Sequence, residues 1–177
     1  MYYGELKKCD IANGTGVRVS LFVSGCTNRC KNCFQPQTWD FCYGKPFTAD
    51  TVQEIYDELD KPYVCGLSIL GGEPFEPANQ RTLFPFLSEM KKQYPDKTVW
   101  IFTGFRLEDE LWREGSYPRC AETDGILSLT DILVDGRYVD DLRDISLQFR
   151  GSRNQRIIDM KKTRATGTPV LWAECRK

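Results

Sequence analysis

The sequence predicts an α/β protein built as a partial, open β/α barrel with mainly parallel strands. Strand-like and helix-like segments alternate along the chain, which is typical of right-handed βαβ units and a parallel sheet. Too few βα units exist for a complete eight-fold barrel, so the barrel is expected to be partial. Glycine follows four predicted strands, at the carboxyl ends where such proteins bind ligands; these glycines are Gly25, Gly71 with Gly72, Gly104 and Gly136.

The first two elements have clear local signals. Residues 17–23 are rich in β-branched and aromatic side chains and lead into Ser24 and Gly25, which predicts a strand followed by a turn. Residues 48–59 open with a capping pattern at Thr48 and then place apolar side chains on one face, which predicts a helix; these side chains are Val52, Ile55, Tyr56 and Leu59.

The next strand and helix follow the same logic. Residues 66–70 form a short apolar run stopped by Gly71 and Gly72, which predicts a buried strand. Residues 79–94 end before Pro95 and carry apolar side chains at helical spacing, which predicts a second helix; these side chains are Leu83, Phe86, Leu87 and Met90.

The second half of the chain has two strong strand signals and several weak ones. Residues 98–103 predict a strand ended by Gly104, and residues 132–134 predict a strand that enters Asp135 and Gly136. A charged surface helix is expected at 107–114. Two candidates for further strands and one ambiguous segment remain, at 146–149, 170–172 and 156–160 respectively.

Composition limits the function classes. The 177 residues are expected to form a single domain, 1–177, with residues 165–177 as a possible C-terminal tail. A formal net charge of -1 disfavours nucleic-acid binding. The longest apolar run, at 21–23, is too short for a membrane span, and no signal peptide is evident, so a cytoplasmic protein is expected.

Cysteine and histidine content points to metal or redox chemistry. Eight cysteines in a reducing compartment argue for metal binding before disulfides. The chain has no histidine, which excludes Ser-His-Asp hydrolysis, Cys-His proteolysis and zinc sites with imidazole ligands.

Three cysteines stand close together just after the first predicted strand. Cys26, Cys30 and Cys33 could wrap one compact metal cluster, and three protein ligands would leave one metal position open. The alternative is an inert four-cysteine site, for which the fourth ligand would come from one of the other cysteines: Cys9, Cys42, Cys65, Cys120 or Cys175.

The spacing Cys26-x-x-x-Cys30-x-x-Cys33 resembles the signature of the radical S-adenosylmethionine superfamily. The run Gly71-Gly72-Glu73-Pro74, at the end of the next predicted strand, resembles the second motif of that superfamily. The resemblance implies a partial barrel of the radical S-adenosylmethionine type. It also implies a [4Fe–4S] cluster with three cysteine ligands and one open iron, which S-adenosylmethionine chelates.

The same resemblance assigns cofactor contacts. Backbone groups around Gly71 and Gly72 would bind the methionine amino end, and Glu73 would either help to neutralise that amino group or be solvated. Many members of the superfamily have an aromatic residue before the third cysteine. In this sequence Asn32 precedes Cys33, so adenine contact is assigned to the backbone at Asn32 and to Phe34.

Further blocks over most of the chain match one narrower family; they lie at 10–14, 23–26, 38–39, 44–48, 100–105, 133–136 and 149–156. They resemble the activating proteins of anaerobic (class III) ribonucleoside-triphosphate reductase. The resemblance implies reductive cleavage of S-adenosylmethionine to a 5′-deoxyadenosyl radical, which takes a hydrogen atom from a glycine Cα of the reductase large subunit. A low-potential flavodoxin or ferredoxin is the implied reductant.

Two other functions stay open at this point. The chain could activate another glycyl radical enzyme, such as pyruvate formate-lyase, or it could be a non-catalytic electron-transfer or structural protein with four cysteine ligands. The block 151–156, the lengthened loop 114–124 and the basic tail 163–177 are candidates for the site, for partner contacts or for decoration.

Overall fold

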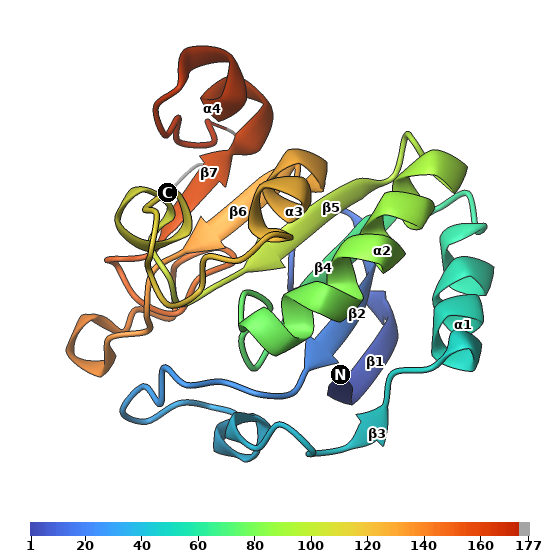
Figure 1. Cartoon of the computed structure of the whole chain (residues 1–177), viewed down its shortest axis with the longest axis horizontal. Helices are drawn as coiled ribbons and strands as arrows, with labels where there is room; N and C mark the ends of the chain where they lie inside the picture. Colours follow the sequence, from blue (N-terminus) through green and yellow to red (C-terminus); the bar gives the residue numbers. More distant parts are fainter. Residues whose placement is uncertain (174–177) are drawn as a thin grey trace.

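In the computed structural model, which describes residues 1–173, the strands form one sheet in the order β3-β1-β2-β4-β5-β6-β7 (Figure 1). The strands are β1 (Tyr2–Asp10), β2 (Val17–Val23), β3 (Lys45–Pro46), β4 (Val64–Gly71), β5 (Thr98–Phe102), β6 (Ile132–Asp135) and β7 (Arg156–Asp159). The α-helices are α1 (Ala49–Leu59), α2 (Pro77–Gln93), α3 (Thr123–Leu129) and α4 (Met160–Thr166). Within these residues, no helix is both long and apolar enough to span a bilayer.

The sheet is open and mixed. The central strands β2, β4, β5 and β6 are parallel, whereas β1 pairs antiparallel with β2 and β3, and β7 pairs antiparallel with β6. The α/β class and the open sheet are therefore confirmed, but the expected predominance of parallel strands is not. The physical reason lies in the connections: β1 reaches β2 through a short loop between Asp10 and Val17, and a parallel pair would need a longer crossover.

Helices α1, α2 and α3 cover one face of the sheet, toward the viewer in Figure 1. Side chains alternate along each strand, so Val99 and Ile101 of β5 join the main core beneath these helices, while Trp100 and Phe102 face the other way. The predicted cap of α1 is present, because Thr48 forms a capping box at its start.

A smaller aromatic cluster fills the opposite face. The Trp100 ring meets Phe149 and Trp172 edge-on, with ring centroids 5.3 Å and 5.2 Å away, and Ile132 and Ile157 pack beside them. The candidate strands at 146–149 and 170–172 are wrong. Residues 145–149 turn and bend so that Phe149, at φ 56°, reaches Trp100, and in 170–172 the single residue Leu171 bridges to β7.

Buried Arg18 ties the parallel strands together on this same face. Its guanidinium donates hydrogen bonds to the Ser68 hydroxyl (2.7 Å) and to the carbonyls of Leu67 (2.8 Å) and Thr98 (2.9 Å). It also lies over the Trp100 ring, 5.5 Å from the centroid. Burial lowers the pKa of the guanidinium to about 10, so the cation remains charged at neutral pH.

The remaining differences from the sequence-based elements concern weakly patterned segments. The expected charged helix at 107–114 is a single π-helical turn, Leu107–Leu111, whose two end side chains are fully buried. Strands β1 and β3 and helices α3 and α4 were not predicted. The ambiguous segment 156–160 is strand β7 followed by the first residue of α4.

Removing the Trp100 side chain should destabilise the fold strongly. Trp100 is 1 % exposed and is the centre of the aromatic cluster, so Trp100→Ala leaves a cavity and should cost about 3–5 kcal/mol in the free energy of unfolding. Chemical denaturation measures the change. Trp100→Phe, which keeps an aromatic ring, is the control with a smaller expected loss; an equal loss in both variants would contradict this packing role.

Candidate functional site

The largest cavity described, of about 730 Å³, opens where the parallel strands end. The turns that follow β2, β4, β5 and β6 all reach this cavity or its rim, as expected for the carboxyl ends of parallel strands. All the residues that were predicted individually as metal ligands or cofactor contacts line it; they are Cys26, Cys30, Asn32, Cys33, Phe34, Gly71, Gly72 and Glu73.

The three cysteines belong to one short loop that leads out of β2. Cys26 is buried at the end of the strand, whereas Cys30 and Cys33 are half-buried. Burial raises the pKa of the Cys26 thiol to about 12 and also raises the pKa of the Cys30 thiol. Among residues 1–173, no three Cys, Asp or Glu side chains already surround a single metal position.

Backbone strain distinguishes this cysteine loop, residues 26–33, from an ordinary surface turn. Arg29 and Asn32 have φ values of 45° and 56°, in the left-handed region that non-glycine residues rarely occupy. Such conformations persist only where neighbouring groups enforce them. The amide of Asn32 donates to Asp140 (2.6 Å), and the Cys33 N–H donates to the Cys30 carbonyl (3.1 Å).

The turn after β4 packs directly against the start of the cysteine loop. The Gly72 N–H donates to the Val23 carbonyl (2.7 Å), and the Glu73 N–H donates to the Gly25 carbonyl (2.8 Å). A Cβ on Gly72 would lie 2.6 Å from the Gly25 oxygen, closer than any carbon can approach. Gly71 has φ 102°, which also favours glycine. The two turns therefore form one rigid wall of the cavity.

Glu73 is fully buried, so the alternative in which it is solvated is wrong. Its carboxylate accepts hydrogen bonds from the Thr103 hydroxyl (2.7 Å), the Gly104 N–H (2.7 Å), the Phe75 N–H (3.0 Å) and the Asn28 amide (2.8 Å). Burial raises the pKa of the carboxyl to about 7. Glu73 thus joins the cysteine loop to the end of β5.

The opposite wall comes from the segment between β6 and β7. The Gln155 side-chain oxygen accepts the N–H groups of Gly151 (2.8 Å) and Ser152 (3.1 Å), while its amide donates to the Gly136 carbonyl (3.0 Å). Arg156 binds Glu108 and Asp135 through its guanidinium. The block 151–156 is therefore built into the cavity wall and the fold beneath it.

Exposed apolar side chains stand at the mouth of the cavity. Phe34 is 77 % exposed and Ile145 is 91 % exposed, yet both line the opening. Side chains this apolar and this exposed are suited to contact with another molecule.

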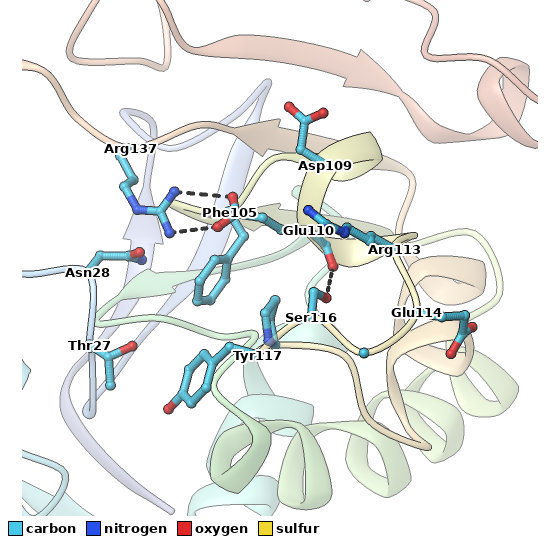
Figure 2. A pocket seen from close by; sticks show the side chains of 12 residues that line it. Thr27, Asn28, Phe105, Asp109, Glu110, Arg113, Glu114, Ser116, Tyr117 and Arg137 are labelled. Carbon is cyan, nitrogen blue, oxygen red and sulfur yellow. Dashed lines mark hydrogen bonds and ion pairs between the residues drawn. The ribbon is translucent and has the colours of Figure 1, made fainter.

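A second cavity, of about 350 Å³, lies on the other side of the cysteine loop (Figure 2). Thr27 and Asn28 form one side of it, and Tyr117 from the lengthened loop points toward them across the cavity. Arg137 closes its upper side through a bidentate pair with Glu110 (3.2 and 2.7 Å).

Sequence patterns did not indicate several residues with contacts in or around the site, among them Thr27, Asn28, Glu76, Tyr117 and Asp140. Glu76 stands three residues after Glu73, directly behind the glycine motif, and this position could have singled it out. The others are polar residues in loops with no distinctive local pattern. Their roles arise only from contacts between distant segments.

Comparison with known proteins gives consistent matches. The description "4Fe-4S single cluster domain" applies to the family model that matches residues 12–158. A protein of Enterobacteria phage T4 named anaerobic ribonucleoside-triphosphate reductase-activating protein is 36% identical over 89% of this chain and 93% of its own length. Proteins with the same name are 38% identical in Haemophilus influenzae and 36% identical in Escherichia coli K12, each over 88% of this chain and 96% of their own length.

Adding a methyl group at Gly72 should disturb the wall formed by the two turns. Because its Cβ would overlap the Gly25 carbonyl, Gly72→Ala should cost about 1–3 kcal/mol in unfolding free energy and speed hydrogen exchange at residues 26–33. Gly115→Ala is the control for backbone strain alone, since its φ is 75° but its Cβ would meet nothing within 4 Å; it should leave exchange at residues 26–33 unchanged. Unchanged exchange in the cysteine loop of Gly72→Ala would contradict the proposed overlap.

Proposed function

Because this chain belongs to the family of anaerobic ribonucleoside-triphosphate reductase-activating proteins and carries a 4Fe–4S domain, we propose that it is a radical S-adenosylmethionine activase. It would be an oxidoreductase whose substrate is a glycine in the large subunit of the reductase. When bound, the [4Fe–4S] cluster and S-adenosylmethionine would together supply a 5′-deoxyadenosyl radical, which takes a hydrogen atom from the glycine Cα. The observation that carries the proposal is that the cysteine loop and the turn 71–73 line one cavity.

Cys26, Cys30 and Cys33 are the proposed cluster ligands. Thiols are the usual protein ligands of iron–sulfur clusters, and these three line the same cavity from a single loop. Three ligands leave one iron open, which suits a site that must also hold S-adenosylmethionine. The raised pKa values of Cys26 and Cys30 mean that binding the cluster would release protons.

The turn after β4 is the proposed seat of the methionine end of S-adenosylmethionine. Gly71 and Gly72 line the cavity wall, and their lack of side chains lets this turn pack closely against the backbone of residues 22–25. Glu73 already accepts hydrogen bonds from the chain itself, so its principal task is to hold this wall in place. Asn32 and Phe34 line the same cavity, and the proposal assigns adenine contact to the backbone at Asn32 and to the Phe34 ring.

The open sheet supports a partial barrel of the radical S-adenosylmethionine type, with its site at the carboxyl ends of the strands. The mouth is rimmed by exposed Phe34 and Ile145, and glycine has no side chain to hinder entry of a peptide backbone. Docking of the reductase would bury these apolar side chains and exclude water from a reactive radical.

The reductant and the compartment are parts of the same proposal. A low-potential flavodoxin or ferredoxin would deliver the electron. The described cysteines are all free thiols, in keeping with a reducing cytoplasm. The net charge of -1 gives no support to a nucleic-acid partner.

Two rivals are less well supported. Activation of pyruvate formate-lyase uses the same chemistry, but the relatives compared above are named for the reductase. An inert four-cysteine site needs a fourth thiol near the loop. Cys9, Cys42 and Cys65 are exposed, Cys120 is half-buried, and none of the four lines the cavity. Cys175 lies outside the described residues.

Cysteine substitutions separate the proposal from the four-cysteine rival. After anaerobic reconstitution with iron and sulfide, each of the single substitutions Cys26→Ser, Cys30→Ser and Cys33→Ser should reduce 5′-deoxyadenosine formation to background. The matched control replaces Cys9, Cys42, Cys65, Cys120 and Cys175 with serine and should retain both iron and activity. Loss of iron in that control would favour the rival.

Adding the partner tests the substrate. Reduction of the loaded protein with S-adenosylmethionine and the reductase large subunit should give a glycyl-type electron paramagnetic resonance signal. Pyruvate formate-lyase in place of the reductase should give none. If the protein with a fully loaded, reduced cluster forms no 5′-deoxyadenosine, the proposed enzymatic activity is refuted. If a radical forms only on pyruvate formate-lyase, the activity stands and the proposed protein substrate is wrong.

A further inference from the structure

Glu76 is a fully buried carboxylate whose hydrogen-bond partners lie far from it in sequence. It stands at the start of α2, but its side chain does not cap that helix. Instead, one carboxylate oxygen accepts both the Thr27 N–H (2.7 Å) and the Thr27 hydroxyl (2.6 Å). Burying a carboxylate is costly unless strong hydrogen bonds compensate for lost water. Glu76 therefore fixes the residue next to Cys26.

The second oxygen of Glu76 faces the lengthened loop. It accepts a hydrogen bond from the Tyr117 hydroxyl (2.6 Å). The Tyr117 ring lies 6.3 Å from that of Phe105, at the wall of the second cavity (Figure 2). Tyr117 thus links the loop 114–124 to the cysteine loop through a single carboxylate.

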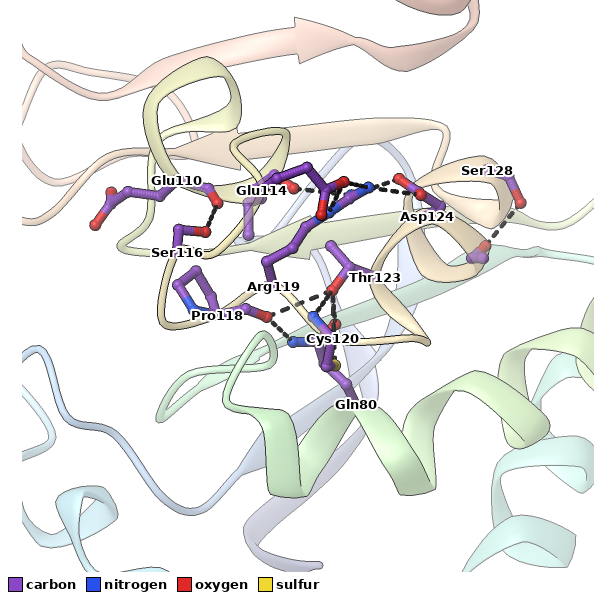
Figure 3. Close-up of polar contacts among 12 residues, drawn as sticks. Gln80, Glu110, Glu114, Ser116, Pro118, Arg119, Cys120, Thr123, Asp124 and Ser128 are labelled. Carbon is purple, nitrogen blue, oxygen red and sulfur yellow. Dashed lines mark hydrogen bonds and ion pairs between the residues drawn. The ribbon is translucent and has the colours of Figure 1, made fainter.

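The lengthened loop is itself firmly held (Figure 3). The Gln80 amide of α2 donates to the Pro118 carbonyl (2.6 Å) and its oxygen accepts the Thr123 hydroxyl (2.7 Å). Arg119 donates to Asp124 (2.6 and 2.8 Å) within the same loop. A loop anchored in this way can hold Tyr117 in a constant position.

The cysteine loop needs such support because two of its residues occupy strained left-handed conformations. Glu73 holds Asn28 and Glu76 holds Thr27, so two adjacent residues between Cys26 and Cys30 are bound by buried carboxylates. Removal of groups that support metal ligands through hydrogen bonds commonly lowers metal affinity by about 10–100-fold.

We infer that Glu76 is a positioning residue for the cysteine loop and that Tyr117 is its outer partner, so that the lengthened loop braces the cluster site. This rests on the proposed function, because it takes Cys26, Cys30 and Cys33 as the cluster ligands. Glu76 touches neither cluster nor substrate; it sets the position of Thr27, and through it the spacing of the first two ligands.

The test uses the full chain with two test variants, one rescue variant and one control variant. Glu76→Ala removes all three hydrogen bonds, and Tyr117→Phe removes only the outer one while the ring stays. Glu76→Gln should rescue, since its amide oxygen can still accept from Thr27 and its amide nitrogen can donate to the Tyr117 oxygen. The matched control is Tyr94→Phe, which breaks a similar hydroxyl–carboxylate bond to Asp60 (2.8 Å) outside the site.

Two readouts are measured. In the metal-free protein, hydrogen exchange at Thr27 should be faster in Glu76→Ala and Tyr117→Phe than in the wild type. In the reconstituted protein, iron release to a chelator should be about 10–100-fold faster in Glu76→Ala and less accelerated in Tyr117→Phe. Glu76→Gln and Tyr94→Phe should match the wild type in both.

Wild-type rates of exchange and iron release in both Glu76→Ala and Tyr117→Phe would overturn the inference. A failure of the proposed function has a different signature. If the wild-type protein holds its cluster but forms no 5′-deoxyadenosine, the proposed activase function is refuted. The iron-release rates of the variants still test the positioning role of Glu76 in that case. If the wild type takes up no iron, the hydrogen-exchange rates at Thr27 alone test whether Glu76 positions the cysteine loop.

Discussion

The hydrogen bonds that join the turns after β2 and β4 are the constraint on which the site depends. The parallel ladder does not stop at the paired residues Val23 and Gly71, because the N–H groups of Gly72 and Glu73 continue it to Gly25, the residue before the cysteine loop. The Glu73 carboxylate then extends the same connection to the end of β5 at Thr103. Three strands, the glycine turn and the start of the cysteine loop are consequently joined by one continuous set of hydrogen bonds.

Local sequence patterns were sufficient for the buried framework of this protein. The central strands are apolar runs ended by glycine, and α1 and α2 have a helical repeat, so their signals do not depend on distant residues. Strand β1 is different, since exposed Glu5, Lys7 and Lys8 obscure its alternation. Helices α3 and α4 have only seven residues each, too short for a clear repeat.

For the candidate site, as for the fold, the sequence predicted the central elements and did not predict the contacts that support them. Topology brings the carboxyl ends of parallel strands together, and this places the cysteine loop beside the glycine turn. The supporting contacts are of another kind: Tyr117 and Glu76 are 41 positions apart, and Thr27 and Glu76 are 49 apart. In the sequence alone, Thr27, Glu76 and Tyr117 have the character of solvated polar residues. Only the structure shows the hydrogen bonds between them.

The two margins of the open sheet limit how this protein can associate with others. At one margin, β3 contributes only Lys45 and Pro46, and proline has no N–H to offer. At the other, the chain after α4 folds back onto β7, with the Trp172 N–H donating to the Ile157 carbonyl (2.9 Å). Such margins hinder the edge-to-edge growth that leads to aggregation. Pairing of a partner strand is thereby hindered at β7 and at the end of β1 that β3 covers, Tyr2 and Tyr3.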